Sequence, residues 1–186
     1  MKLHYYKKRP KEEKAFKHKM DLFVRRENEV GLLSWGEGGT GKTALISWVL
    51  LWQLSAELKI DIVYWKNVTN FNKQQFYNEF ADQIEISQNL PALSRFKKAQ
   101  KKFRGVVLIV FDDVYGYNVD KVLETFEDFE PHTRALCLAR TEFNKEGLIK
   151  LDVLINRTLS ICCSITLAIS ILTKQSLRKW PSWWGK

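Results

Sequence analysis

The residues that could carry chemistry begin with a glycine-rich stretch between an apolar run and a helical pattern. Residues 36–43 read Gly-Glu-Gly-Gly-Thr-Gly-Lys-Thr and fit the eight-residue Walker A pattern at each required position. Glycines let the backbone curl until successive N–H groups point at phosphate oxygens, and a helix that follows adds its positive N-terminal end. The stretch therefore predicts a phosphate-binding loop formed by Gly36, Gly38, Gly39, Thr40, Gly41, Lys42, Thr43 and Ala44.

Two side chains of this loop and two acids further along the chain predict a site for a nucleotide and Mg²⁺. Lys42 would contact the β- and γ-phosphates, and the Thr43 hydroxyl would bind the metal. The apolar run 106–111 ends in Asp112-Asp113, which is the Walker B arrangement, and we expect it on a strand neighbouring the one before the loop. Asp112 would hold Mg²⁺ through a water, while Asp113 would orient an attacking water or simply hold its loop. A chance glycine-rich turn is the alternative, which the two motifs together disfavour.

The elements that must position these residues are short apolar runs alternating with longer amphipathic stretches. The six consecutive apolar residues of 106–111 suit a central parallel strand that is covered on both faces. Strands and helices in alternation predict an α/β fold, a three-layer P-loop NTPase sandwich with a mostly parallel sheet. The predicted strands cover 32–35, 60–65, 106–111 and 135–139, and the predicted helices cover 43–58, 72–86 and 119–129.

The net charge of +9 is concentrated at the two ends of the chain. Residues 1–20 carry +6 and residues 174–186 carry +4, so the middle, at −1, is close to neutral. We expect residues 1–20 to be a solvated basic lead-in that can form a helix, 21–155 to be the nucleotide-binding domain, and 156–186 to be a short apolar segment with a basic, aromatic tail. Since the excess positive charge lies outside this middle part, it gives little support to a nucleic-acid partner.

A nucleic-acid-associated ATPase is nevertheless the rival function class. Its support is a basic run just before the central strand, formed by Arg95, Lys97, Lys98, Lys101, Lys102 and Arg104. A solvated helix face explains such a run more simply. We therefore expect no nucleic-acid partner.

Neither a membrane nor an oxidising compartment is expected. The apolar run 159–172 has 14 residues, short of the ~20 that span a bilayer, so a buried terminal strand or helix is the preferred interpretation. Cys162 and Cys163 are adjacent and Cys137 is distant, so the three cysteines do not form a disulfide framework. A reducing, cytoplasmic location follows.

Four stretches together resemble the nucleotide-binding domain of the NB-ARC group, which comprises STAND-class P-loop ATPases of plant disease-resistance proteins and apoptotic protease-activating factors. Residues 23–29 are similar to the family's VGRE segment, and 35–45 to its P-loop. Residues 108–114, Leu-Ile-Val-Phe-Asp-Asp-Val, are similar to its kinase-2 strand, and 133–140 to the segment that ends in Thr-Thr-Arg. The resemblance covers roughly residues 22–155, and it implies that Arg140 senses the γ-phosphate.

The sequence also departs from the NB-ARC pattern. Arg25 stands where the VGRE segment has glycine, and Ala139 replaces a threonine before Arg140. Only eight residues separate Glu27 from Gly36, so the helix that the family places there is expected to be missing. After Lys150 there is no Gly-x-Pro or Met-His-Asp motif. We therefore expect a nucleotide-binding subdomain truncated before the lid modules that close over ADP.

The resemblance implies a switch in defence or cell-death signalling that is closed with ADP, open and oligomeric with ATP, and reset by slow hydrolysis. The implied partners are a second copy of the chain or a signalling protein. No glutamate is placed as a strong general base, so we expect slow hydrolysis or none. A non-catalytic truncated regulator is the remaining alternative. The implied catalytic residues are Lys42, Asp112, Asp113 and Arg140.

Overall fold

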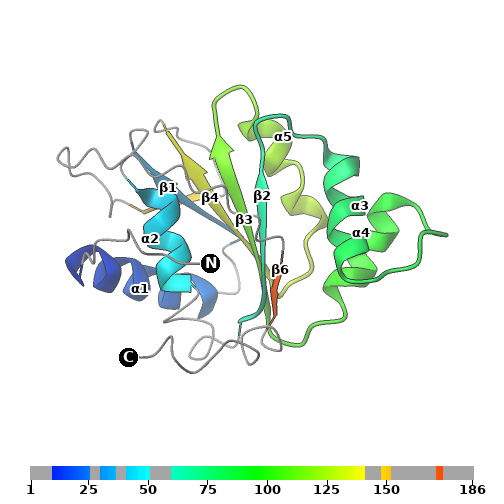
Figure 1. Cartoon of the computed structure of the whole chain (residues 1–186), viewed down its shortest axis with the longest axis horizontal. Coiled ribbons are helices and arrows are strands. Elements are labelled where there is room, and N and C mark those ends of the chain that lie inside the picture. Colours follow the sequence, from blue (N-terminus) through cyan, green and yellow to red (C-terminus); the bar gives the residue numbers. More distant parts are fainter. Residues whose placement is uncertain are drawn as a thin grey trace.

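The computed structural model describes residues 10–25, 30–36, 41–50, 60–140, 148–151 and 171–173. In these ranges helices flank a six-stranded sheet (Figure 1). The strands are β1 (Gly31–Trp35), β2 (Ile60–Asn67), β3 (Val106–Val114), β4 (Thr133–Ala139), β5 (Leu148–Leu151) and β6 (Ile171–Thr173). The helices are α1 (Pro10–Arg25), α2 (Lys42–Val49), α3 (Lys73–Gln83), α4 (Ala92–Gln100), α5 (Val119–Leu123) and the short 3₁₀ helix η2 (Phe126–Asp128).

The strand order is β5-β1-β4-β3-β2-β6, with only β6 antiparallel to its neighbour. The predicted mostly parallel α/β sandwich is therefore confirmed. The expected position of the Asp112 strand is wrong, because β4 lies between β1 and β3. Each β4 residue is buried, which suits a central place in the sheet. Apolar patterning identifies such strands but does not order them.

Two apolar clusters, one on each face of the sheet, hold the three layers together. Alternate β3 side chains point to opposite faces. Ile109 and Phe111 pack with apolar side chains of α3 and α4, which we call the α3–α4 cluster. Leu108 and Val110 pack with apolar side chains of α1 and α2, which we call the α1–α2 cluster. The α3–α4 cluster is rich in aromatic rings, and Tyr77 and Phe96 stack at 4.4 Å between centroids. This double coverage explains the continuous apolar run of β3, whose carboxyl end carries the two acids.

The helix α1 corrects the expectation of a solvated lead-in. It runs from Pro10 to Arg25, across the boundary expected at residue 20, and Phe16 and Met20 are fully buried in the α1–α2 cluster. Phe16, Met20 and Phe23 follow the spacing of one helix face, which is the signal that the high charge of this region concealed. The described part of the lead-in is therefore a core helix.

The other predicted elements agree in type and differ in extent. The predicted helix 43–58 is seen as α2, and residues 51–59 lie outside the described residues. The predicted helix 119–129 divides into α5 and η2. The helix expected to carry the basic run 95–104 is seen as α4, while β5 was not predicted as a separate element. Of the apolar run 159–172, only the last two residues are described, and they begin β6. In the described part of the chain, no helix combines the length and apolar character needed to cross a membrane.

The rate at which a thiol reagent modifies Cys137, in the middle of β4, can be used to measure how readily the fold opens. Its side chain is fully buried, and burial raises the pKa of the thiol to about 12. At pH 8 only about one thiol in ten thousand is then ionised. We expect a thiol reagent to modify Cys137 at least about a thousandfold more slowly in the native protein than in denaturant. Peptide mass spectrometry would measure this separately from Cys162 and Cys163, and fast native modification would contradict it.

Candidate functional site

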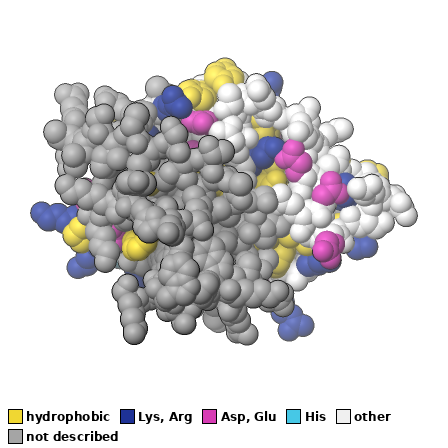
Figure 2. Space-filling model, in the orientation of Figure 1, with side chains coloured by type: hydrophobic (Ala, Val, Ile, Leu, Met, Phe, Trp, Pro, Cys, Tyr) yellow, Lys and Arg dark blue, Asp and Glu magenta, His cyan; other side chains and the backbone are white. Residues whose placement is uncertain are grey.

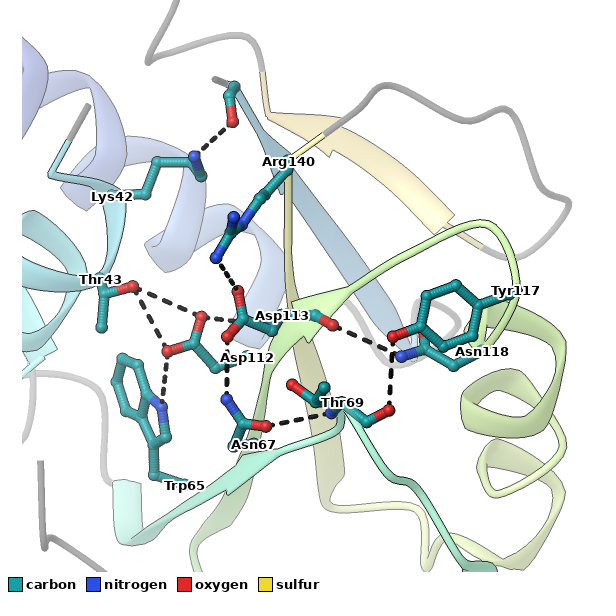
Figure 3. Close-up of polar contacts among 11 residues, drawn as sticks. Lys42, Thr43, Trp65, Asn67, Thr69, Asp112, Asp113, Tyr117, Asn118 and Arg140 are labelled. Carbon is teal, nitrogen blue, oxygen red and sulfur yellow. Dashed lines mark hydrogen bonds and ion pairs between the residues drawn. The ribbon is translucent and has the colours of Figure 1, made fainter. Parts of the chain in front are cut away.

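The described residues of the predicted site meet where the carboxyl ends of the parallel strands share one edge of the sheet (Figure 3). Lys42 and Thr43 come from the first turn of α2, directly after the β1 loop. Asp112 and Asp113 come from the end of β3, and Arg140 follows β4. This edge is where α/β sheets of this type place their ligands.

The structure describes the two ends of the predicted phosphate loop, Gly36 and residues 41–43. Gly41 precedes α2 with φ 79°, a left-handed conformation that glycine adopts without steric cost. The Gly36 N–H donates to the Ala139 carbonyl at 3.2 Å, which ties the start of the loop to β4. Ala44 lies in the first turn of α2 and is partly buried. Gly38, Gly39 and Thr40 lie outside the described residues.

Lys42 is the buried cation of the site. Its side chain is 8% exposed, and the ammonium group donates to the Gly36 carbonyl. Burial lowers the pKa of Lys42, and the nearby positive charge of Arg140 lowers it further, against the opposing effect of Asp112 and Asp113. A desolvated ammonium beside a second cation is a group that an anion such as a phosphate would stabilise.

Asp112 faces Thr43, as a metal site at this position requires. The Thr43 Oγ1 lies 3.3 and 3.4 Å from the two carboxylate oxygens of Asp112. Burial raises the pKa of Asp112, and the Asp113 charge adds to this, while hydrogen bonds from Trp65, the Asp113 N–H and Thr43 act in the other direction. One hydroxyl and one carboxylate suit Mg²⁺, which takes few protein ligands and completes its shell with water and phosphate oxygens.

The metal would therefore depend on the nucleotide. Among the described residues there is no group of three His, Cys, Asp or Glu side chains that could hold an ion alone. Thr43 and Asp112 fit a Mg²⁺ that is shared with a bound phosphate, as in other nucleotide sites.

Asp113 is held by its neighbours in an unusual backbone conformation. Its φ is 62°, in the left-handed region that side chains other than Asn and Asp rarely adopt, and the β3–β4 register shifts at this point. One carboxylate oxygen accepts from Asn67 Nδ2 at 2.9 Å, and the other accepts from the Arg140 guanidinium at 3.3 Å. The conformation thus turns the carboxylate toward the ends of β2 and β4.

Arg140 lies between the phosphate-loop strand and the acid-bearing strand. About half of its side chain is exposed, and its guanidinium lies 5.6 Å from the centre of the Tyr115 ring. The cation can therefore move from Asp113 toward an anion in the loop without losing a buried contact. The γ-phosphate-sensing role that the family resemblance implies for Arg140 stays a prediction.

Sequence reasoning missed two contributors from β2. Trp65 Nε1 donates to an Asp112 oxygen at 3.2 Å, and Asn67 donates to Asp113. Trp65 ends the strand that the sequence predicts over 60–65, and the structure extends this strand to Asn67. Since parallel strands end at the same edge, polar groups at the end of 60–67 could have been assigned to the site.

One residue of the basic run before β3 belongs to the core, and the other five are exposed or partly exposed. Arg95, expected on a solvated face, is only 4% exposed and pairs with Asp82. Lys97 lies 3.9 Å from Asp128, and Lys101 lies 3.4 Å from Glu130. On the face shown in Figure 2, acidic and basic side chains are interspersed, and the described residues form no continuous basic patch there.

A scan against protein-family models and a search of curated proteins give no match. Two solved structures share the fold, and a third is similar at a lower TM-score. The ORC1 protein of Aeropyrum pernix in complex with DNA has a TM-score of 0.51 at 19% identity. The similarity covers 70% of this chain and 38% of the ORC1 chain. Drosophila ORC bound to DNA has a TM-score of 0.50 at 15% identity, and the similarity covers 72% of this chain and 38% of the ORC chain. A STAND protein with a tetratricopeptide repeat sensor from Pyrococcus horikoshii has a TM-score of 0.45 at 17% identity, covering 72% and 22%.

The chain thus spans less than half the length of these three structures. At such identities the similarity describes the fold and not the activity. The parallel sheet, the glycine loop before α2 and the acids at the end of β3 agree with it. The chain has the fold of a P-loop NTPase.

Proposed function

We propose that the chain binds ADP and ATP with Mg²⁺ as the nucleotide-binding module of an NB-ARC-type signalling switch. The observation that carries the proposal is the convergence of Lys42 and Thr43 with Asp112, Asp113 and Arg140 at one edge of the sheet. In this proposal the protein acts in the cytoplasm, in defence or cell-death signalling. Its partner is a second copy or a signalling protein.

Each side chain has a distinct task in nucleotide binding. Lys42 would exchange its contact with the Gly36 carbonyl for the β- and γ-phosphates. Thr43 and Asp112 would hold Mg²⁺, which neutralises phosphate charge when bound. Arg140 would leave Asp113 for the γ-phosphate, a contact that ADP cannot offer. Such a difference in contact is what a switch between the ADP and ATP forms requires.

Hydrolysis is expected to be slow or absent. Asp113 stands where an attacking water would be activated, but both of its carboxylate oxygens already accept hydrogen bonds, from Asn67 and Arg140. An oxygen that already accepts a hydrogen bond is less available to accept the proton of an attacking water. Even after Arg140 moved to a phosphate, Asn67 would still occupy one oxygen.

Thermal unfolding with added nucleotide tests the proposal. ADP or ATP with Mg²⁺ at a hundred times its Kd should stabilise the protein by about 2.7 kcal/mol. AMP is the control, because it lacks the phosphates that Lys42 would contact. Equal unfolding temperatures with and without millimolar ADP and ATP would reject nucleotide binding.

A nucleic-acid-associated P-loop ATPase is the second candidate function. Two proteins of similar fold were solved with DNA, and α1 exposes Lys11 and Lys14. The expectation of no nucleic-acid partner therefore stays a prediction. Retention of the protein on duplex DNA with a steep dependence on salt would favour this candidate, and weak retention at low salt would reject it.

A further inference from the structure

A tryptophan from β2 contacts the carboxylate that would hold the metal. The Trp65 Nε1–H donates to Oδ2 of Asp112 at 3.2 Å (Figure 3). An indole N–H is a donor only, so Trp65 can neither bind a metal nor take up a proton. Its contribution to the site must come through Asp112.

The sheet places this ring beside the carboxylate. In the parallel pairing of β2 and β3, Trp65 lies opposite Val110 and Asn67 lies opposite Asp112. Trp65 packs against the α1–α2 cluster, to which Val110 belongs, and Asp112 follows Val110 by two residues, on the side of Thr43. Diagonal neighbours of this kind are within reach of an aromatic side chain. The donor is therefore held by a strand and an apolar cluster.

Both oxygens of the Asp112 carboxylate have a donor. The Asp113 N–H donates to Oδ1 at 3.0 Å, while Trp65 donates to Oδ2. The Thr43 hydroxyl contacts both oxygens at longer distances, 3.3 and 3.4 Å. A backbone N–H and a packed ring together fix the plane of the Asp112 carboxylate. The lone pairs that accept from neither donor therefore point in a fixed direction.

We propose that Trp65 is a positioning residue of the metal site, whose N–H orients Asp112 to hold a water of Mg²⁺. This inference rests on the proposed nucleotide and Mg²⁺ binding. Groups that orient metal ligands typically change metal affinity 10–100-fold when they are removed, without being ligands themselves.

The test is the Mg²⁺ dependence of nucleotide binding by Trp65→Phe. The variant keeps an aromatic ring and removes the N–H, so the Mg²⁺ concentration that half-saturates ATP binding should rise about tenfold. Affinity for ATP in EDTA should stay within about twofold, because no phosphate contact changes. The matched control is Trp48→Phe, which alters a tryptophan of α2 packed against the same apolar cluster and should leave both quantities unchanged.

The Asp112→Asn background distinguishes positioning from packing. If Trp65 acts through the carboxylate, Trp65→Phe should have no further effect on the Mg²⁺ dependence once Asp112 is replaced. An equal loss of affinity in EDTA and in Mg²⁺, or the same tenfold effect in the Asp112→Asn background, would overturn the proposal.

An NMR spectrum of the nucleotide-free protein tests the contact between Trp65 and Asp112 without relying on nucleotide binding. It can be recorded even if Trp65→Phe does not fold. The chain has seven tryptophans, so ¹⁵N labelling gives up to seven indole signals. One of them should shift on Asp112→Asn and not on the control Lys98→Ala. If no signal responds to Asp112→Asn, the contact is absent and the inference fails. If a signal shifts but nucleotide does not bind, the proposed function fails instead.

Discussion

Lys42→Ala is expected to weaken ADP and ATP binding by at least about a hundredfold, or about 2.7 kcal/mol. Hydrogen bonds to charged groups contribute about 1.5–3 kcal/mol each, and Lys42 would contact two phosphates. Isothermal titration at fixed Mg²⁺ would measure the loss. The matched control is Lys98→Ala, which removes an exposed lysine of α4 and should change neither affinity.

The same substitution should not destabilise the nucleotide-free protein. Lys42 is buried, and both its burial and Arg140 lower its pKa, so folding disfavours its charged form. Between the lowered pKa and the ordinary value of 10.5, the unfolded chain binds more protons than the folded one. Wild-type stability should therefore rise with pH in that window, and Lys42→Ala should lack this rise.

The two measurements together make the test specific. Lost nucleotide binding with an unchanged or higher unfolding temperature identifies Lys42 as a group kept for its ligand at some cost to stability. Unchanged nucleotide affinity in a folded variant would reject the phosphate-loop assignment. Loss of both binding and folding would mean that Lys42 is primarily structural.

The sequence predicts the central part of the fold because strong local signals coincide there. The apolar run of β3, the glycines before α2 and the acids at 112–113 each belong to an element whose type can be assigned locally. The order of the strands could not be assigned in this way. The place of β4 between β1 and β3 depends on crossovers, which local patterns do not encode.

The site was predictable where its residues form motifs and not where they act through tertiary contacts. Lys42, Thr43 and Asp112 follow from spacing, whereas Trp65 becomes part of the site only through the pairing of β2 with β3. Charge was the most misleading signal. It concealed the apolar face of α1, and it made Arg95 resemble a surface residue.

Arg95→Ala is expected to lower the free energy of unfolding by about 3 kcal/mol, because the guanidinium satisfies several acceptors at once. Arg95 is 4% exposed and donates to the carbonyls of Ile86 and Ser87 at 3.1 and 3.2 Å. It also donates to the side chains of Asn78, at 2.7 Å, and Asp82, both on α3. Asp82 is about half exposed, so most of the loss should come from the other acceptors.

Urea unfolding would measure the effect of Arg95→Ala, and two further variants define its origin. Lys101→Ala removes an exposed lysine that pairs with the partly buried Glu130 next to the same helix, and it should cost at most about 0.5 kcal/mol. Arg95→Lys keeps the charge but not the planar fork, so it should recover only part of the loss. If Arg95→Ala cost less than about 0.5 kcal/mol, the contacts of Arg95 with α3 would not stabilise the fold as expected.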